Sequence, residues 1–397
     1  MVGSMNETIY MPVGEVCSSI SDTYREKKNM VTLINTSDVL EGRVLNHERV
    51  PNSNLKGQFK KTFQRDDILY SEIRPQNRRF AYVDFSPIDY IASTKLMVIR
   101  AKKDVVSPKY LYYFLKNSST VAELQLLAET RSGTFPQITF SEFANLAIPV
   151  PSLAVQEVIV QTMQCLEDKI ICNEQINDNL EQQAQSYFQE LFVDNADPEW
   201  AIGTISDLGT VVGGSTPSKA KPEYYTESGI AWITPKDLSI NKSKFVSHGE
   251  NDITELGLKN SSAAIMPEGT VLFSSRAPIG YIAIAAGEVT TNQGFKSVVP
   301  KLEIGTPFVY FFLKNTLPVI EGMASGSTFK EVSGSTMKNV PAVIPDAETL
   351  AKFSDFCAPI FAQQRILEEQ NQSLATLRDN LLPKLMSGEI DVSTVQF

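Results

Sequence analysis

The sequence predicts an α+β protein in which two long antiparallel coiled-coil helices hold two β-rich globular domains apart, as a tandem repeat with pseudo-twofold symmetry. Three observations predict this class. The 397-residue chain repeats itself at a spacing of about 194–198 residues. Each copy holds about 150 residues of short β-type runs. Each copy then ends in about 40 residues whose apolar side chains follow a helical period.

The repeat is clearest in two short matches. Tyr112–Asn117 corresponds to Tyr310–Asn315, and Ile148–Pro151 corresponds to Ala342–Pro345. A solenoid unit has roughly 20–50 residues, so this longer repeat indicates a domain-plus-helix module used twice. The expected boundaries are 1–150 for the first β-rich domain, 151–193 for the first long helix, 194–345 for the second domain, and 346–397 for the second long helix with the C-terminal tail.

Short β-type runs inside each domain alternate with Gly, Pro, Asn and Ser. Val31–Ile34, Ile68–Ile73 and Tyr281–Ala285 are examples. A short helix is expected at Pro108–Lys116 and again at Pro307–Lys314, because Pro suits the first helical turn.

In the long helices, apolar and small polar residues recur in alternating steps of four and three, in the same register in both copies. This spacing places them on one seam of a coiled coil, and forty helical residues span roughly 60 Å. Asn177 and Asn371 share a heptad position, where a polar residue costs stability but can fix register. In the alternative interpretation, each helix packs on its own domain. The residues expected on the seam are Leu166, Ile170, Asn177, Leu180, Tyr187, Leu191, Ile360, Leu367, Asn371, Leu374, Leu381 and Leu385.

The net charge of −10 argues against a nucleic-acid partner, but the charge is uneven. Residues 151–192 hold one basic and seven acidic side chains, whereas Leu55–Phe80 holds seven basic and three acidic ones. A local basic patch can steer DNA even on an acidic chain. No stretch approaches the roughly 20 apolar residues of a membrane span, no secretory signal is visible, and the four cysteines lack CxxC spacing. We therefore expect a cytoplasmic protein with free thiols and no membrane contact.

Signatures of catalysis are missing from the sequence. There is no GK[ST] phosphate loop, no GxGxxG fingerprint and no Asn/Asp-Pro-Pro-aromatic run of amino-methyltransferases. Only two histidines occur, His47 and His248, so a histidine-based triad or zinc site is not expected. Gly213–Pro217 is either a turn or a phosphate-contacting loop. These absences favour a recognition or scaffold protein.

The order of these elements resembles the specificity subunit of Type I restriction–modification enzymes. The resemblance rests on Gly133–Thr139 followed by Ile148–Pro151 and Gln156, on Ser325–Phe329 followed by Pro345, and on the closing Leu381–Val392. In the second domain, Gly214–Pro217, Trp232–Leu238, Ser274–Gly280 and Thr291–Lys296 also look like a common domain type of that family. The second copy departs from the pattern at Glu348 and Leu350, where a Gln often follows the Pro-rich segment, and the first domain matches less well.

The resemblance implies a non-catalytic subunit that chooses the DNA sequence. Each β-rich target-recognition domain would read one half of a split target in double-stranded DNA, and the helices would set the spacing. Two methyltransferase subunits would dock on the helices and supply the S-adenosylmethionine site, and restriction subunits would join for cleavage. This chain would bind no cofactor and no metal, and its acidic helices would be protein-docking surface.

Candidate DNA contacts are basic and amide side chains in loops, because Arg, Lys, Asn and Gln read base edges and phosphates. Arg78 and Arg79 beside Gln76 and Asn77 are the strongest pair. Replacing both arginines by Ala should weaken DNA binding and flatten its salt dependence. The candidates are Lys56, Lys60, Lys61, Arg74, Gln76, Asn77, Arg78 and Arg79 in the first domain, and Ser215, Thr216, Lys219, Lys221, Lys236, Arg276, Asn292, Gln293 and Lys296 in the second.

Two other functions remain open at this point. One is a non-enzymatic coiled-coil scaffold that joins two protein partners. The other is a standalone nuclease or methyltransferase, which the missing motifs disfavour. A neighbouring gene with an amino-methyltransferase motif would favour the DNA-specificity function over the scaffold.

Overall fold

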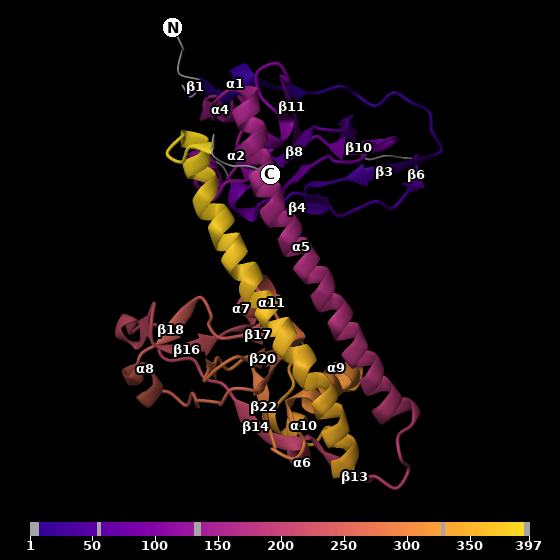
Figure 1. Cartoon of the computed structure of the whole chain (residues 1–397). Coiled ribbons are helices and arrows are strands. Elements are labelled where there is room, and N and C mark those ends of the chain that lie inside the picture. Colours follow the sequence, from indigo (N-terminus) through magenta and orange to yellow (C-terminus); the bar gives the residue numbers. More distant parts are fainter. Residues whose placement is uncertain (1–7, 54–56, 131–135, 327–329, 393–397) are drawn as a thin grey trace. The chain divides into compact units, whose positions relative to one another are not determined.

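The computed structural model describes residues 8–53, 57–130, 136–326 and 330–392. The chain forms two compact units, drawn in Figure 1. Unit 1 is Met1–Ile170 with Ser373–Phe397, and unit 2 is the continuous segment Ile171–Gln372. The long helices α5 (Leu153–Gln189) and α11 (Ala347–Ser387) therefore each contribute to both units.

Unit 1 contains two four-stranded sheets and a two-stranded ribbon. The first sheet is antiparallel, and the second contains one parallel pair, β3 (Met30–Ile34) with β10 (Tyr90–Ser93). The first sheet has the order β2 (Cys17–Ile20), β11 (Leu96–Ala101), β8 (Ile68–Ser71), β9 (Phe80–Tyr82). The second has the order β6 (Val50–Pro51), β3 (Met30–Ile34), β10 (Tyr90–Ser93), β7 (Phe59–Lys61). The ribbon pairs β1 (Ile9–Pro12) with β12 (Ala147–Val150), and a small hairpin pairs β4 (Val39–Leu40) with β5 (Arg43–Val44).

Helices cover the first sheet of unit 1. They are α1 (Val13–Val16), α2 (Pro108–Lys116), α3 (Ser118–Glu129) and α4 (Phe140–Phe143). Tyr110 and Tyr113 of α2 are fully buried in the same core as Met163 of α5 and Leu385 of α11. The beginning of one long helix and the end of the other thus complete a single core.

Unit 2 repeats this topology. Its ribbon pairs β13 (Ala201–Thr204) with β23 (Pro341–Ile344). The parallel pair β16 (Ile230–Ile233) with β21 (Thr290–Thr291) corresponds to β3 with β10, and β17 (Phe245–Val246) with β20 (Ile279–Ala285) is a second parallel pair. The larger sheet has the order β14 (Gly209–Gly213), β22 (Lys296–Pro300), β19 (Val271–Ser275), β20 (Ile279–Ala285), β17 (Phe245–Val246). The smaller has the order β15 (Tyr225–Thr226), β18 (Asn251–Ile253), β16 (Ile230–Ile233), β21 (Thr290–Thr291). The helices are α6 (Ile205–Leu208), α7 (Pro235–Ile240), α8 (Glu255–Lys259), α9 (Thr306–Gly322) and α10 (Gly334–Lys338).

The expected fold class, a tandem repeat of β-rich domains each followed by a long helix, is confirmed. The short helix expected at Pro108–Lys116 has those bounds, whereas its counterpart α9 is longer than expected and continues past Pro318 to Gly322. The first long helix ends in a π-helical turn, Glu190–Asp194.

The long helices run antiparallel inside unit 2. Asn173 of α5 donates to Asn371 of α11 over 2.8 Å, and the ring of Tyr187 of α5 lies tilted against that of Phe356, with centroids 4.5 Å apart. The described seam residues are all buried or half-buried. Phe188 and Phe353, by contrast, pack into the unit's own globular core. The two alternative packing modes therefore occur together: the helices contact each other and also the β-rich domain.

Candidate nucleic-acid interface

Five of the candidate residues in unit 2 come together around one polar hollow of about 370 Å³. They come from three separate segments: Thr216 and Lys219 follow β14, Lys236 lies in the first turn of α7, and Asn292 and Gln293 follow β21. The lining residues are Thr216, Lys219, Trp232, Thr234, Pro235, Lys236, Asp237, Glu250, Asn251, Asn292 and Gln293.

Asp237 holds one wall of the hollow. One oxygen of its buried carboxylate accepts hydrogen bonds from the backbone N–H of Thr234 over 2.7 Å and from its hydroxyl over 2.6 Å, as a capping box for α7. The other oxygen accepts from the backbone N–H of Glu250 over 2.8 Å. One side chain therefore fixes the end of β16, the start of α7 and the approach to β18.

The segment Gly213–Pro217 forms a packed turn on the opposite wall. The backbone N–H of Ser215 donates to the carbonyl of Thr291 over 2.9 Å, and the indole N–H of Trp232 donates to the carbonyl of Ser215 over 3.0 Å. A Cβ at Gly214 would lie 1.9 Å from the carbonyl oxygen of Asn292, so only glycine fits. Because the backbone N–H of Ser215 already donates to Thr291, it is not available to a phosphate, as it would be in a phosphate-contacting loop.

Asn292 and Gln293 project from the turn between β21 and β22. The side-chain oxygen of Asn292 accepts from the backbone N–H of Gly294 over 2.8 Å. The hydroxyl of Thr216 donates to the side-chain oxygen of Gln293. The amide groups are therefore oriented by the chain itself.

Carboxylates neutralise several of the candidate cations. Lys236 pairs with Glu250 over 2.5 Å, which raises the pKa of the Lys236 ammonium. Beside the hollow, Glu331 contacts Arg276 over 3.4 Å and Lys296 over 3.7 Å.

Two further lysines of unit 2, Lys219 and Lys221, are not paired with a described carboxylate. The ammonium group of Lys221 lies 5.3 Å from the ring centroid of Tyr224. Lys219 is exposed and has no carboxylate partner within the described residues. It is therefore a cation that remains available to a phosphate.

Several candidate cations of unit 1 are held inside the unit. Lys61 donates to the carbonyls of Thr94 over 3.1 Å and Leu96 over 2.7 Å, and burial lowers its pKa. Arg78 donates to the hydroxyl of Ser118 over 2.7 Å, and Arg79 to the carbonyl of Ser37 over 2.9 Å. The two adjacent guanidinium groups are thus bound to different neighbours.

The remaining candidates of unit 1 are exposed where they are described. Lys60 lies in β7, and Arg74, Gln76 and Asn77 lie around the one-turn 3₁₀ helix Pro75–Asn77. Lys56 lies outside the described residues.

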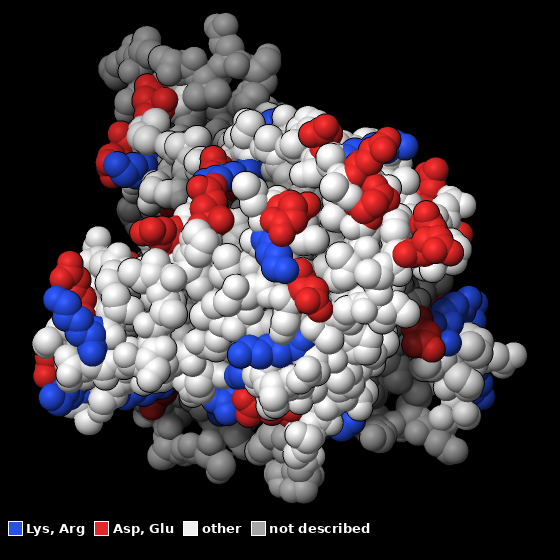
Figure 2. Space-filling model, turned by 90° about the horizontal axis from the view of Figure 1, so that it is seen from below, with Lys and Arg blue, Asp and Glu red and all other residues white. Residues whose placement is uncertain are grey.

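Charge on the surface is mixed. On the face that Figure 2 shows, the described Lys and Arg side chains lie singly or in small groups among Asp and Glu. Any nucleic-acid contact on this face therefore depends on local groups of side chains rather than on a broad basic field.

Comparison with known proteins decides the family. A family model described as the Type I restriction modification DNA specificity domain matches residues 9–182 and again residues 198–377. The chain belongs to the Type I restriction–modification DNA specificity family. Each match spans the β-rich part of one unit and most of the long helix that follows.

The relatives of this specificity-family chain include two curated subunits. The specificity subunit of the Type I restriction enzyme HindI from Haemophilus influenzae is 29% identical over 435 residues, covering 91% of this chain and 94% of that protein. The MjaIX specificity subunit from Methanocaldococcus jannaschii is 39% identical over 194 residues, covering 47% of this chain and 45% of that protein.

A solved structure shows the same fold. It is the S subunit of the Type I restriction–modification system from M. genitalium, with a TM-score of 0.54 at 17% identity over 97% of this chain and 98% of that one. Among the described residues of the specificity-family chain, no helix is long and apolar enough to cross a membrane.

The hollow includes residues of this specificity-family chain that the sequence candidates omit. Trp232 and Asp237 line it although both side chains are almost fully buried, and Glu250 pairs with Lys236. The Thr234-Pro-Lys-Asp237 sequence is a capping-box signal that could have located Asp237. In unit 1, Lys95 follows β10 in the same way that Asn292 follows β21 in unit 2. The ammonium group of Lys95 pairs with Glu72 over 3.6 Å.

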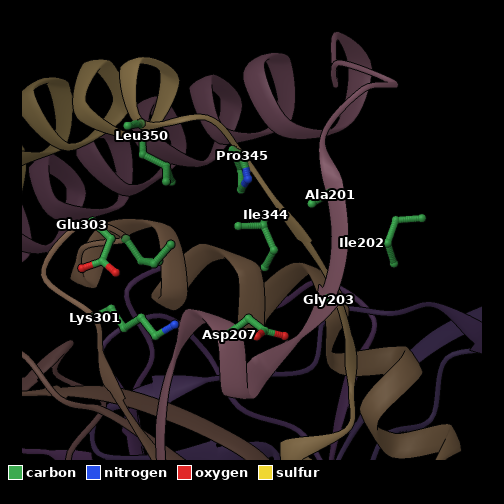
Figure 3. A pocket seen from close by; sticks show the side chains of 11 residues that line it. Ala201, Ile202, Gly203, Asp207, Lys301, Glu303, Ile344, Pro345 and Leu350 are labelled. Atoms are coloured by element: carbon green, nitrogen blue, oxygen red, sulfur yellow. The ribbon is translucent and has the colours of Figure 1, made fainter.

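A second hollow of about 410 Å³ in unit 2 has a different character. Figure 3 shows Ile344, Pro345 and Leu350 around it, with Asp207 and Lys301 along one side. The equivalent of Leu350 in unit 1 is Gln156, whose side-chain oxygen accepts from the backbone N–H of Ser107 over 2.8 Å. None of the described DNA-contact candidates lines this hollow.

Proposed function

We propose that this chain is the DNA-recognition subunit of a Type I restriction–modification enzyme, and that each unit reads one half of a bipartite double-stranded target. The observation that carries the proposal is the duplication of one reader module. Two matching β-rich domains joined to paired helices suit two half-sites at a fixed spacing. In the polar hollow of unit 2, oriented amides and the exposed Lys219 supply groups that contact bases and phosphates.

The long helices are proposed to set the spacing and to dock two methyltransferase subunits. Apolar side chains that are exposed on them suit protein contact: Ile171, Ile176, Ile366 and Leu377 are 39–47% exposed. The chain itself performs no catalysis and binds no cofactor in this proposal. S-adenosylmethionine binds to the methyltransferase subunits, restriction subunits join the complex for cleavage, and the complex acts in the cytoplasm.

Methylation mapping tests the proposal. DNA from cells that express this chain with its methyltransferase partner should carry modification in both halves of a split motif with a fixed gap. Exchanging residues 194–345 for those of a relative should change one half only. The control is the same partner with another specificity subunit, which shows that the partner is active.

Two results would contradict the proposal. The first is no new methylation by an active partner, which would favour a coiled-coil scaffold that joins two proteins. The second is methyl transfer by the chain alone, which would indicate a catalytic site on this chain.

A further inference from the structure

The hydrogen bonds around Asn292 determine which groups the hollow of unit 2 offers to DNA. Its side-chain oxygen faces inward and accepts from the backbone N–H of Gly294 over 2.8 Å. Because a backbone N–H can only donate, this bond fixes which end of the amide is oxygen. The side-chain NH₂ group has no partner within the described residues, and Asn292 lines the hollow. The residue therefore presents donors.

Packing holds Asn292 in this orientation. A Cβ at Gly294 would lie 2.9 Å from the side-chain oxygen of Asn292 and 2.9 Å from Cγ of Pro235, closer than Cβ contacts normally come. The backbone of Asn292 is fixed as well, because its N–H donates to the carbonyl of Ile233 over 3.0 Å. The donor group is thus set before any ligand arrives, which lowers the entropy cost of binding.

The neighbouring side chains add donors more than acceptors. The side-chain oxygen of Gln293 is engaged by the hydroxyl of Thr216, and Lys219 and Lys236 offer only N–H groups. One carboxylate oxygen of Glu250, Oε2, is paired with Lys236 over 2.5 Å. Asn251 also lines the hollow, but no hydrogen bond with a described residue orients its side-chain amide, so it favours no particular base.

A donor in the major groove distinguishes the bases. Guanine presents two adjacent acceptors, N7 and O6, whereas adenine presents N7 beside the N6 donor. An Asn side chain reads adenine by offering its oxygen to N6 and its NH₂ group to N7. At Asn292 the oxygen is turned away to Gly294, so the N6 amino group of adenine would face another donor.

We propose that Asn292 reads a guanine in the half-target of unit 2 by donating from its side-chain NH₂ group to N7 and O6. Lys219, which lines the same hollow, contacts a phosphate. This inference rests on the proposed function and adds the base that one residue selects. Gly294 acts as a positioning residue, because it leaves room for the inward-facing oxygen of Asn292.

The test uses the full chain in complex with its methyltransferase subunits, once methylation mapping has given the half-target of unit 2. Each guanine of that half is replaced in turn by 7-deazaguanine, which lacks the N7 acceptor. At one position the wild-type complex should lose about three- to tenfold in affinity, as expected for one hydrogen bond. Asn292→Asp keeps the oxygen that accepts from Gly294 but loses the donor, so its complex should show no 7-deazaguanine penalty at that position.

Two further variants separate base reading from general binding. Lys219→Gln should weaken binding to all sequences and lower its salt dependence, and should keep the 7-deazaguanine penalty. Gly294→Ala should remove the penalty with Asn292 intact, because the added methyl group displaces the amide. Base preference in the half-target of unit 1 should be unchanged in every variant, and thermal unfolding confirms that each one is folded.

Three results would overturn the inference while the proposed function stands. They are a half-target of unit 2 without any G·C pair, a wild-type complex that is indifferent to 7-deazaguanine at every position, and an Asn292→Asp complex that keeps the penalty. A wild-type complex that recognises no bipartite sequence would instead contradict the proposed function.

Discussion

At the residue scale, Lys244 is a buried cation that no pattern in the sequence predicts. Its side chain is only 6% exposed. The ammonium group donates to Glu181 over 2.8 Å and to Gln364 over 2.9 Å, and it lies 3.5 Å from the ring centroid of Phe361. Burial lowers the pKa of Lys244 to about 8 although Glu181 opposes the shift. Burial by itself raises the pKa of Glu181, but Lys244 and Lys314 lower it to about 2.

Replacing Glu181 by Gln should therefore destabilise unit 2. The change leaves the buried ammonium of Lys244 without its counter-ion, and breaking such a pair costs about 3–5 kcal/mol of unfolding free energy. Denaturant unfolding at neutral pH measures the loss. Glu190→Gln, on an exposed face of the same helical segment, serves as the matched control and should stay within about 0.5 kcal/mol of wild type. An equal effect of both substitutions would contradict the assignment.

The stability difference between wild type and Glu181→Gln should depend on pH. The folded-state pKa of Glu181, about 2, lies below its ordinary value of 4.5, so the folded state binds fewer protons between these values. The carboxylate's contribution is complete above pH 4.5 and disappears as the pH falls through about 2. The two unfolding free energies should therefore converge on acidification. A difference that stays constant down to pH 2 would show that the charge of Glu181 is not the cause.

At the element scale, a hydrogen bond between two asparagines joins the antiparallel helices at one register. The sequence pattern placed Asn177 and Asn371 at equivalent heptad positions, but the partner of Asn371 is Asn173, one turn earlier. In an antiparallel pair, equivalent positions of the two helices need not face each other. Asn177 instead accepts from Gln364 through its backbone carbonyl over 3.2 Å.

Replacing Asn371 by Leu should cost about 1–3 kcal/mol of unfolding free energy, because the buried amide of Asn173 loses its 2.8 Å hydrogen bond and keeps only the 3.5 Å contact with Gln370. The double substitution Asn173→Leu with Asn371→Leu should recover most of that loss, since two leucines bury each other well. Unfolding of both single variants and the double variant forms a double-mutant cycle. Additive effects would indicate that the two residues do not interact. Asn179→Leu, at an exposed position of α5, is the control.

At the scale of the whole chain, unit 1 is closed by the last residues of the sequence. Leu382, Leu385, Met386 and Val392 are buried in the same core as Tyr110 of α2. Unit 2 by contrast is continuous in sequence.

A chain that ends at Gln372 should therefore lose hydrogen-exchange protection in unit 1 and keep it in unit 2. Exchange rates of α2 and α9, which occupy equivalent places in the two units, give the comparison. Leu385→Ala tests the same point without truncation, and should cost about 2–5 kcal/mol of unfolding free energy in unit 1. Equal loss of protection in α2 and α9 would contradict this division of the chain.

Much of the fold follows from sequence because its signals are local or repeated. The long helices are visible from their alternating spacing, and the repeated segments of α2 and α9, both rich in aromatic residues, reveal the duplication. The grouping of Thr216, Lys236 and Asn292 could only be suggested by residue type, because the loops that carry them are far apart in the chain. Their proximity depends on sheet pairing, which a single sequence does not show.

The contacts of individual cations could not be predicted. Lys61 and Arg79 are bound by backbone carbonyls, and a carbonyl acceptor carries no signature in the sequence. Trp232 and Asp237 were not among the candidates because DNA contacts are expected at exposed side chains. Both residues line the hollow although they are almost fully buried.

The closure of unit 1 by the C-terminal residues also has a consequence for synthesis. Residues 1–170 emerge from the ribosome first. The C-terminal segment that completes their core, up to Val392, is synthesised only after the whole of unit 2. Unit 2 can fold as soon as its own continuous segment has emerged. Unit 1 therefore begins to be translated first but can close its core last. Chains that terminate before residue 373 would carry an open unit 1, which chaperones and proteases can distinguish from a closed one.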